Sequence, residues 1–480
     1  MAPLKTPEVE VSKVVKEPSV LELGTVKALS KIPGFSGLSP SRRVITAIRG
    51  GSWTMFGYGA GQVLRLVSTL TLARMLVPQA FGLVALVNVF LSGLEMLSDL
   101  GIGMDVVQHP RGDDPAFINT AFLIQAIRAV GLWVIATALA YPFARFYHQP
   151  AVLTLLIVGS VSVLLRGFVS GSLWSLTRHV ELGKYNVLIA STDFFGFAVS
   201  LIWAFISPTA WALVVGRVAS TIAVLVSSHV IAKDPVSLTW DPQAARDIFA
   251  FGTGIFLSTA TYFLSGEAER LVVGKFVTLV ELGCFSIAIS VSSAAARGLQ
   301  QIISQVFFPM MADSLREDQV VAHRHYRKVR RLLLIVSAGL AVGFILLSHP
   351  FVTFVLGPKY AMAGWMMQLL GVRGAIELFM SVAVSMLFAL GTSKYAATGN
   401  IYKLIFLGAG FAVAFGWFGF YTAVWVLTIA PLANYIPLLF GLKRYCQPVL
   451  RTELASFATF AAITGIAAII AGVFSHLHGF

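Results

Sequence analysis

Two short stretches decide the fold: PFARFYHQP at residues 142–150 and PFVTFVLGP at residues 350–358. Both follow the pattern P-F-x-x-F-x-x-x-P, they lie 208 positions apart, and each joins two long apolar runs. FGYG at 56–59 and FGTG at 251–254 open a further pair of apolar runs in the same order. We interpret the chain as one set of membrane spans that occurs twice.

The apolar runs around these motifs are long enough to cross a membrane. Hydrophobic residues make up 57% of the 480 positions and charged residues only 12%, which is about half the charge of a soluble domain. Each run covers a hydrocarbon core about 30 Å thick, and none alternates as a barrel strand does. We predict an all-α polytopic membrane protein with spans at 51–76, 81–103, 118–143, 151–173, 186–207, 209–232, 248–266, 281–305, 332–356, 362–390, 401–418, 422–440 and 454–474.

The first twelve spans divide into two sixes. The N-terminal lobe covers 51–232 and the C-terminal lobe 248–440, and a cytoplasmic linker at 233–247 joins them. Since six is even, both lobes start on the same side, so the repeat is parallel about an axis along the membrane normal. Residues 1–50 are expected to form a flexible basic tail, and 441–480 a loop followed by the thirteenth span.

Lysine and arginine gather on one side of the predicted spans. The tail and the loops on its side hold 23 of the 35 basic residues, and the opposite loops hold only Arg145, Arg270, Lys275 and Lys359. Basic loops stay in the cytoplasm, so we predict a cytoplasmic N-terminus. The run HRHYRKVRR at 323–331 lies between two spans, and we interpret it as a topogenic loop with no nucleic-acid partner.

Eight basic residues remain inside the predicted spans. Arg74 and Lys403 lie near helix ends, where a long side chain reaches the interface. The other six are deep, and each would cost about 2.5 to 3.5 kcal/mol if it faced lipid. These six are expected to face the bundle interior or water, as ligands of a substrate or as partners of carbonyls and acids: Arg65, Arg128, Arg166, Arg217, Arg297 and Arg373.

Fewer acidic side chains lie inside the spans than basic ones. Even if every acid pairs, two deep arginines are left over, so the interior is net positive and suits an anion. The planar guanidinium of arginine suits phosphate best. These acids either form salt bridges or couple transport to an ion: Glu95, Asp99, Asp193 and Glu377. As an example of a salt bridge, Glu95 or Asp99 of span 81–103 is expected to pair with Arg65.

The repeat places two of the arginines at a similar depth. An offset of 208 relates Arg166 to Gly374, the neighbour of Arg373. We predict that these two arginines face each other from the two lobes and hold an anionic group between them.

Other residue types give weaker indications. Trp174 and Trp365 flank the arginine-bearing spans, where they either anchor the interface or stack on sugars. No spacing typical of metal ligands occurs, and no metal or cofactor is expected. Cys284 and Cys446 are placed near opposite faces, so no disulfide is expected between them.

Several segments resemble one transporter family in the right order. The stretch LARMLVPQAFGLVA, Leu72 to Ala85, is similar to the opening of the polysaccharide exporters of the Wzx type. These belong to the multidrug/oligosaccharidyl-lipid/polysaccharide (MOP) superfamily. The resemblance covers about residues 50 to 445 and includes SDLGIG at 98–103, LTRHVELGKYNVL at 176–188, WALVVGRVAS at 211–220, VFFPMMADSLRED at 306–318 and VLGPKYAMAGWMMQLL at 355–370.

This resemblance implies a fold and a function. The fold is MATE-like, with two six-helix lobes that work by alternating access. The implied function is a lipopolysaccharide or other surface-polysaccharide flippase in the bacterial inner membrane. It moves undecaprenyl-diphosphate-linked oligosaccharide to the periplasmic leaflet, with membrane lipid and a polysaccharide polymerase or export complex as partners.

Three other functions remain open at this point. A multidrug or cation antiporter belongs to the same superfamily, but deep arginines repel cations. A peptidoglycan-precursor flippase also carries a diphosphate lipid, so cavity charge does not separate it from the polysaccharide function. A membrane glycan polymerase needs a large extramembrane loop, whereas the longest loop between the predicted spans, 306–331, has only 26 residues. We therefore expect no enzyme activity.

Overall fold

The computed structural model describes residues 42–179, 181–232, 237 and 239–478, and these ranges form helices and turns. Contacts divide the chain into a short unit, Met1–Gly51, and a large unit, Ser52–Phe480, to which the architecture below belongs. The predicted tail lies outside the described residues as far as position 41. Its last part is helical, because α2 begins at Arg42.

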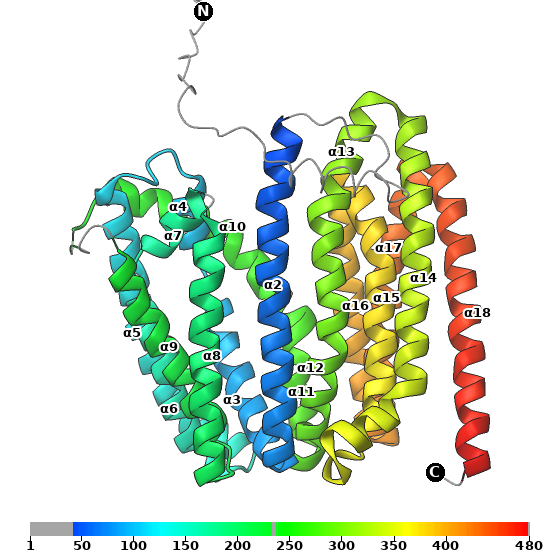
Figure 1. Cartoon of the computed structure of the whole chain (residues 1–480), viewed down its shortest axis with the longest axis horizontal. Coiled ribbons are helices and arrows are strands. Elements are labelled where there is room, and N and C mark those ends of the chain that lie inside the picture. The colour runs from blue at the N-terminus through cyan, green and yellow to red at the C-terminus, as the bar shows by residue number, and fades with distance from the viewer. Residues whose placement is uncertain (1–41, 180, 233–236, 238, 479–480) are drawn as a thin grey trace, which may run out of the picture. The chain divides into compact units, whose positions relative to one another are not determined.

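The long helices of the N-lobe (Figure 1) cover nearly the same residues as the first six predicted spans. Two short helices, α4 (Ile102–Gln108) and α7 (Ser172–Arg178), interrupt the series. The long helices are α2 (Arg42–Met75), α3 (Pro78–Met96), α5 (Pro115–Phe146), α6 (Pro150–Gly167), α8 (Leu182–Ile206) and α9 (Trp211–Ile231).

Helices of the C-lobe are more often interrupted. Four segments are π-helical: η1 (Phe263–Glu267), η2 (Ile303–Phe307), η3 (Val352–Leu356) and η5 (Ala414–Phe418). A 3-10 turn, η4 (Pro358–Tyr360), follows η3. The helices are α10 (Pro242–Tyr262), α11 (Ala268–Phe276), α12 (Leu279–Ile302), α13 (Phe308–Glu317), α14 (Gln319–Phe351), α15 (Ala363–Ala389), α16 (Lys394–Val413), α17 (Phe420–Tyr445) and the additional α18 (Gln447–His478).

Length and composition mark most of these helices as membrane spans. Eleven of the described helices are long and apolar enough to cross a membrane. The two predicted spans outside that set, 51–76 and 248–266, correspond to α2 and to α10 with η1 and α11. The protein is therefore a multi-pass membrane protein.

Helix packing repeats between the lobes as the sequence motif does. In the N-lobe α5 packs on α6, α8 on α9, and α6 on both α3 and α9. In the C-lobe α14 packs on α15, α16 on α17, and α15 on both α12 and α17. Pro142 and Pro350 lie inside the equivalent helices α5 and α14, as the 208-residue offset predicts. This confirms two lobes of the same internal design.

The lobes meet where α3 crosses α12. A Cβ added at Gly82 would lie 2.3 Å from the Leu279 carbonyl oxygen, and one added at Gly283 would lie 1.8 Å from the Pro78 carbonyl oxygen. Any side chain there would clash, so glycine at both positions allows the two backbones to touch.

Further contacts join the lobes at the end predicted to face away from the cytoplasm. Arg74 at the end of α2 donates from Nε to the Val355 carbonyl at 2.6 Å, and Lys359 donates to the Arg74 carbonyl at 2.6 Å. Tyr147 of the N-lobe donates to the Leu271 carbonyl at 2.8 Å. At this end the two lobes are therefore closed against each other.

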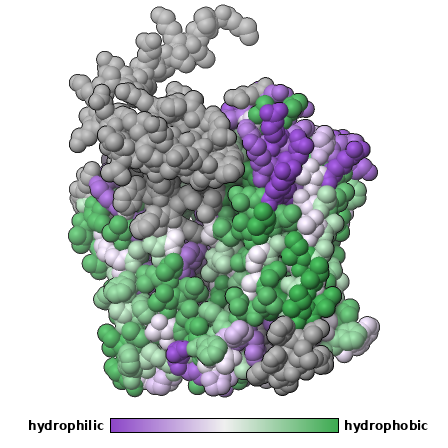
Figure 2. All heavy atoms as spheres, turned by 45° about the vertical axis from the view of Figure 1, so that its right-hand side comes forward, coloured by the Kyte–Doolittle hydropathy of each residue, from purple (hydrophilic) through white to green (hydrophobic). Residues whose placement is uncertain are grey.

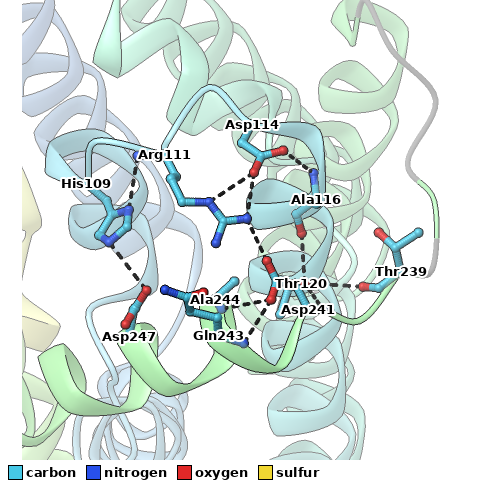
Figure 3. Close-up of polar contacts among 10 residues, drawn as sticks. All are labelled: His109, Arg111, Asp114, Ala116, Thr120, Thr239, Asp241, Gln243, Ala244 and Asp247. Atoms are coloured by element: carbon cyan, nitrogen blue, oxygen red, sulfur yellow. Dashed lines mark hydrogen bonds and ion pairs between the residues drawn. The ribbon is translucent and has the colours of Figure 1, made fainter.

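At the opposite end, α10 packs on the N-lobe although it begins the C-lobe in sequence. Its residues Ala244, Ala245 and Ile248 share a buried cluster with α4 and α5. Arg111 donates to Asp114 at 2.7 Å and to Asp241, the N-cap of α10, at 2.6 Å (Figure 3). The first helix of the C-lobe thus packs on the N-lobe.

Two predicted cytoplasmic loops are largely helical in the structure. The segment 312–331 belongs to α13 and α14, apart from Asp318 between them. The segment 441–453 belongs to α17 and α18, apart from Cys446. The prediction of loops rested on the charged residues in these segments. Charge marks where a span leaves the membrane but does not end the helix, because the backbone groups remain hydrogen-bonded within it. The predicted linker 233–247 lies partly outside the described residues, and α10 already begins at Pro242.

Candidate functional site

The C-lobe encloses a cavity of about 930 Å³. Its walls come from the region of η1 and α11, from α12, from α15 and from the start of α16. Of the six arginines predicted to face the interior, Arg297 and Arg373 line it. Eight of its lining residues are Lys, Arg or Glu: Glu267, Glu269, Arg270, Arg297, Arg373, Glu377, Lys394 and Lys403.

Basic groups outnumber acids around this cavity. Five Lys and Arg side chains stand against three Glu. Among the residues that the structure describes, Arg297 and Lys394 have no acidic partner, and both are exposed. Two positive charges in this wall are therefore available to an anion.

Arg373 is held by two carboxylates. It donates from one terminal nitrogen to Glu269 at 2.8 Å and from Nε to Glu377 at 3.3 Å, and its side chain is only 11% exposed. Lys403 lies 3.6 Å from the same Glu377 oxygen and is buried rather than at the interface, which corrects the expectation for this lysine. The network fixes Arg373 in the wall with its charge already compensated.

Sequence reasoning missed the acids of α11. Span 248–266 was expected to end before Glu267, which left Glu269 and Arg270 in an outer loop. The helix instead continues to Phe276, with Glu269 only 5% exposed and Arg270 bonded to Glu267 at 2.5 Å. Apolar residues at helical spacing after Arg270, in LVVGKF, are the signal that favours this continuation.

Two N-lobe arginines are bonded to neutral groups. Arg128 donates to the Glu95 backbone carbonyl at 2.6 Å and to Ser98 at 3.0 Å. Arg217 donates to the Asn88 side-chain oxygen at 2.6 Å and to Ser162 at 3.2 Å. These contacts join neighbouring helices of the lobe.

The remaining two arginines are exposed and only weakly paired. Arg65 lies 3.8 Å from Asp193, and its side chain is 71% exposed. Arg166 lies 3.9 Å from Glu95, and its side chain is 62% exposed. The expected pairing of Arg65 with the acids of span 81–103 is therefore wrong.

Other predicted site residues have structural contacts. Asp99 accepts a hydrogen bond from the Gly101 amide at 2.9 Å, where the backbone turns with a left-handed φ of 60°. Trp174 packs on the cluster of α4, α5 and α10. Trp365 packs on Tyr421, with ring centroids 5.0 Å apart. Neither tryptophan is among the lining residues of the C-lobe cavity.

Comparison with known families identifies the chain. A model described as a polysaccharide biosynthesis protein matches residues 71–363. The chain belongs to this family. It is 20% identical over 344 residues to the teichuronic acid biosynthesis protein TuaB of Bacillus subtilis, covering 71% of each chain. It is 23% identical over 348 residues to the succinoglycan biosynthesis transport protein ExoT of Rhizobium meliloti, covering 71% of this chain and 68% of the relative.

Solved structures share the fold. The lipid II flippase MurJ in an inward closed conformation superposes with a TM-score of 0.65 at 12% identity, over 89% of this chain and 99% of MurJ. An inward-facing MATE-family transporter of the MOP superfamily superposes with a TM-score of 0.61 at 13% identity, over 84% and 96% of the two chains. The predicted all-α, two-lobed MATE-like fold and the resemblance to the Wzx-type exporters are confirmed.

Proposed function

We propose that the protein is a flippase for undecaprenyl-diphosphate-linked oligosaccharide. It carries the unit from the cytoplasmic to the periplasmic leaflet of a bacterial inner membrane, with its N-terminus in the cytoplasm, for export of a surface polysaccharide. The family match over 71–363 carries this proposal, since its curated relatives are named for the biosynthesis or transport of surface polysaccharides. Such proteins transport their substrate and are not enzymes.

Cavity charge supports an anionic cargo. The C-lobe cavity carries a surplus of basic side chains, and a diphosphate bridged to a prenyl chain and a glycan is a dianion. A membrane potential that is negative inside drives a dianion outward by about 4 to 5 kcal/mol per 100 mV. The cavity therefore favours an anionic cargo, and the membrane potential favours its outward movement.

The six predicted arginines divide into two roles. Arg128, Arg217 and Arg373 already have strong partners, so we assign them to holding the helices. Arg65 and Arg166 are exposed with long ion pairs, and Arg297 is exposed without an ion pair to any described residue. We assign the diphosphate contacts to these three, with Lys394 beside Arg297 in the cavity wall. We therefore retain Arg166 in the proposed anion clamp and assign Arg297 to it in place of Arg373.

Two alternatives share the fold. A cation antiporter fits less well, because unpaired Arg297 and Lys394 repel a cation in the C-lobe cavity. A peptidoglycan-precursor flippase has the fold of MurJ, but at 12% identity this similarity concerns the fold alone. The polysaccharide family model favours the first function.

The test uses a strain that lacks this gene. Complete repeat units should accumulate on the lipid carrier, and surface polymer should be lost and then restored by the wild-type protein. Arg297→Gln should fail to restore polymer at equal expression. The matched control is Arg145→Gln, an exposed arginine at the end of α5 that does not line the C-lobe cavity.

Each outcome separates the candidates. Normal carrier pools with changed sensitivity to cationic drugs would favour the antiporter. Accumulated peptidoglycan precursor would favour the other flippase. Full restoration by Arg297→Gln would leave the flippase assignment intact and contradict the role of this residue.

A further inference from the structure

A band of basic side chains surrounds the end of the C-lobe where α14 and α18 begin and α17 ends. Two exposed acids that the structure describes at this end are engaged: Asp313 lies 3.6 Å from Arg316, and Asp318 accepts from the Val320 amide at 2.9 Å. Seven exposed basic residues have no acidic partner among the described residues. We call them the basic rim: Arg324, Arg327, Lys328, Arg331, Lys443, Arg444 and Arg451.

On α14 the rim borders an exposed apolar surface. One turn after Lys328 comes Leu332, which is 52% exposed, and one turn after Arg331 comes Ile335, which is 70% exposed. Residues four apart share one helix face. The outward face of α14 therefore changes from basic to apolar within one turn, as it does where a helix enters a bilayer.

The other two helices change at the same end. On α17 the exposed Phe440, 62% accessible, precedes Arg444 by one turn. On α18 the exposed Arg451 precedes Leu454, which is 48% accessible. Figure 2 shows hydrophilic surface gathered at one end of the molecule, above a broadly hydrophobic surface.

A buried network fixes the three helices beneath the rim. Glu453 of α18 pairs with Arg330 of α14 at 2.7 Å, and both side chains are fully buried. The Glu453 carboxylate also accepts from Tyr326 of α14 and Tyr435 of α17, each at 2.6 Å. Arg330 stacks on the Phe379 ring of α15, 3.3 Å from its centroid. The rim therefore stands on a rigid base, with little freedom for the helices to separate.

We propose that the basic rim binds the phosphate groups of anionic phospholipids. Its charges lie beside exposed apolar residues on all three helices, which fits a headgroup with attached acyl chains better than a soluble anion. The rim also adjoins the cavity: the Tyr445 ring lies 6.1 Å from that of Tyr395, the neighbour of the cavity residue Lys394. Bound headgroups thus lie near the start of α16. This inference requires only a membrane-embedded chain and is independent of the proposed transport.

The experiment measures which lipid stays with the full-length protein. Wild-type protein is reconstituted in nanodiscs of equal parts phosphatidylglycerol and phosphatidylcholine, extracted in mild detergent, and its retained lipid counted by mass spectrometry. Phosphatidylglycerol should be enriched. The enrichment should fall roughly fivefold for each charge removed by Arg327→Gln/Lys328→Gln or Lys443→Gln/Arg444→Gln, and it should weaken as salt rises.

The controls keep the result specific. Lys184→Gln/Arg246→Gln removes two exposed charges from the same end of the N-lobe and α10 and should leave the enrichment unchanged. Arg327→Lys keeps the charge and should retain it. Excess glycerol phosphate should not displace the lipid. An unchanged ratio in both rim variants, an equal fall in the control, or complete displacement by glycerol phosphate would overturn the proposal.

Discussion

The two lobes use basic residues differently at the end predicted to be cytoplasmic. On the N-lobe, Arg111 is bonded to two aspartates, Arg178 to Asp113 at 2.9 Å, and Lys184 to Glu181 at 2.6 Å. On the C-lobe the exposed basic rim has no acidic partner in the part of the chain that the structure describes, and the ion pair of Arg330 lies buried beneath it. Basic residues at this end thus form salt bridges with nearby acids in the N-lobe, whereas those of the basic rim in the C-lobe are exposed to solvent.

This difference limits what a count of charges reveals. The ratio of basic residues on the two sides predicts orientation, but each residue contributes equally to that ratio whether or not an acid holds it. Only the positions of the partner acids distinguish the lobes. Substitutions at the two ends should therefore have different consequences.

The largest expected effect is at the buried pair of the C-lobe. Glu453→Gln leaves the fully buried Arg330 charge without its carboxylate, which should lower the free energy of unfolding by about 3 to 5 kcal/mol. Unfolding in mixed micelles measures this. Arg330→Met combined with Glu453→Leu should recover part of the loss, although two tyrosine hydroxyls lose their acceptor. A loss no greater than that of an exposed pair would contradict the buried role.

A smaller, pH-dependent effect is expected at Arg111. Its hydrogen bonds hold the pKa of Asp114 and of Asp241 below the ordinary value. The stabilisation is therefore present above the unfolded pKa of about 4 and is lost as pH falls through the folded pKa values. Arg111→Met should lower the unfolding temperature at neutral pH, and its curve should converge with that of the wild type in acid. A constant difference down to low pH would exclude this linkage.

Asp105 offers a contrast with Glu453, because it is a buried N-lobe acid whose Oδ2 has no partner among the described residues. Burial raises the pKa of this carboxyl. The folded state therefore binds this proton more tightly than the unfolded chain does, and the stability contribution of Asp105 falls as pH rises above its unfolded pKa. Asp105→Asn should raise the unfolding temperature at neutral pH, and the gain should vanish in acid. A destabilised variant at neutral pH would indicate that the ionised form is needed.

The smallest effect is expected at Lys184, whose side chain is 70% exposed in its pair with Glu181. Exposed pairs contribute about 0 to 1 kcal/mol, so Lys184→Gln should leave thermal unfolding nearly unchanged. If Lys184→Gln lowered the unfolding temperature as much as Arg111→Met does, the Lys184–Glu181 pair would be as important for stability as the pairs of Arg111, contrary to this prediction.

Much of the fold follows from local pattern. The proline motifs at 142 and 350 lie in equivalent helices, and apolar runs located the spans, because both depend on residues adjacent in sequence. Partners depend on distant residues. Arg330 lies within the basic run HRHYRKVRR, yet it is buried and pairs with Glu453 of α18, whereas the other arginines and the lysine of the run are exposed. Likewise the pairing of Arg373 with Glu269 joins residues 104 positions apart, and no spacing within one helix indicates it.

The glycine crossing of α3 and α12 has a consequence for the origin of the chain. Pro78 and Leu279 are the first residues of α3 and α12, and Gly82 and Gly283 are the fifth. Gly82 meets the Leu279 carbonyl, and Gly283 meets the Pro78 carbonyl. Such reciprocal contact between equivalent residues is what a two-fold axis produces in an isologous dimer. The joint inside this single polypeptide thus has the form of a subunit interface, as expected if two copies of a six-helix ancestor once associated here before their genes were fused.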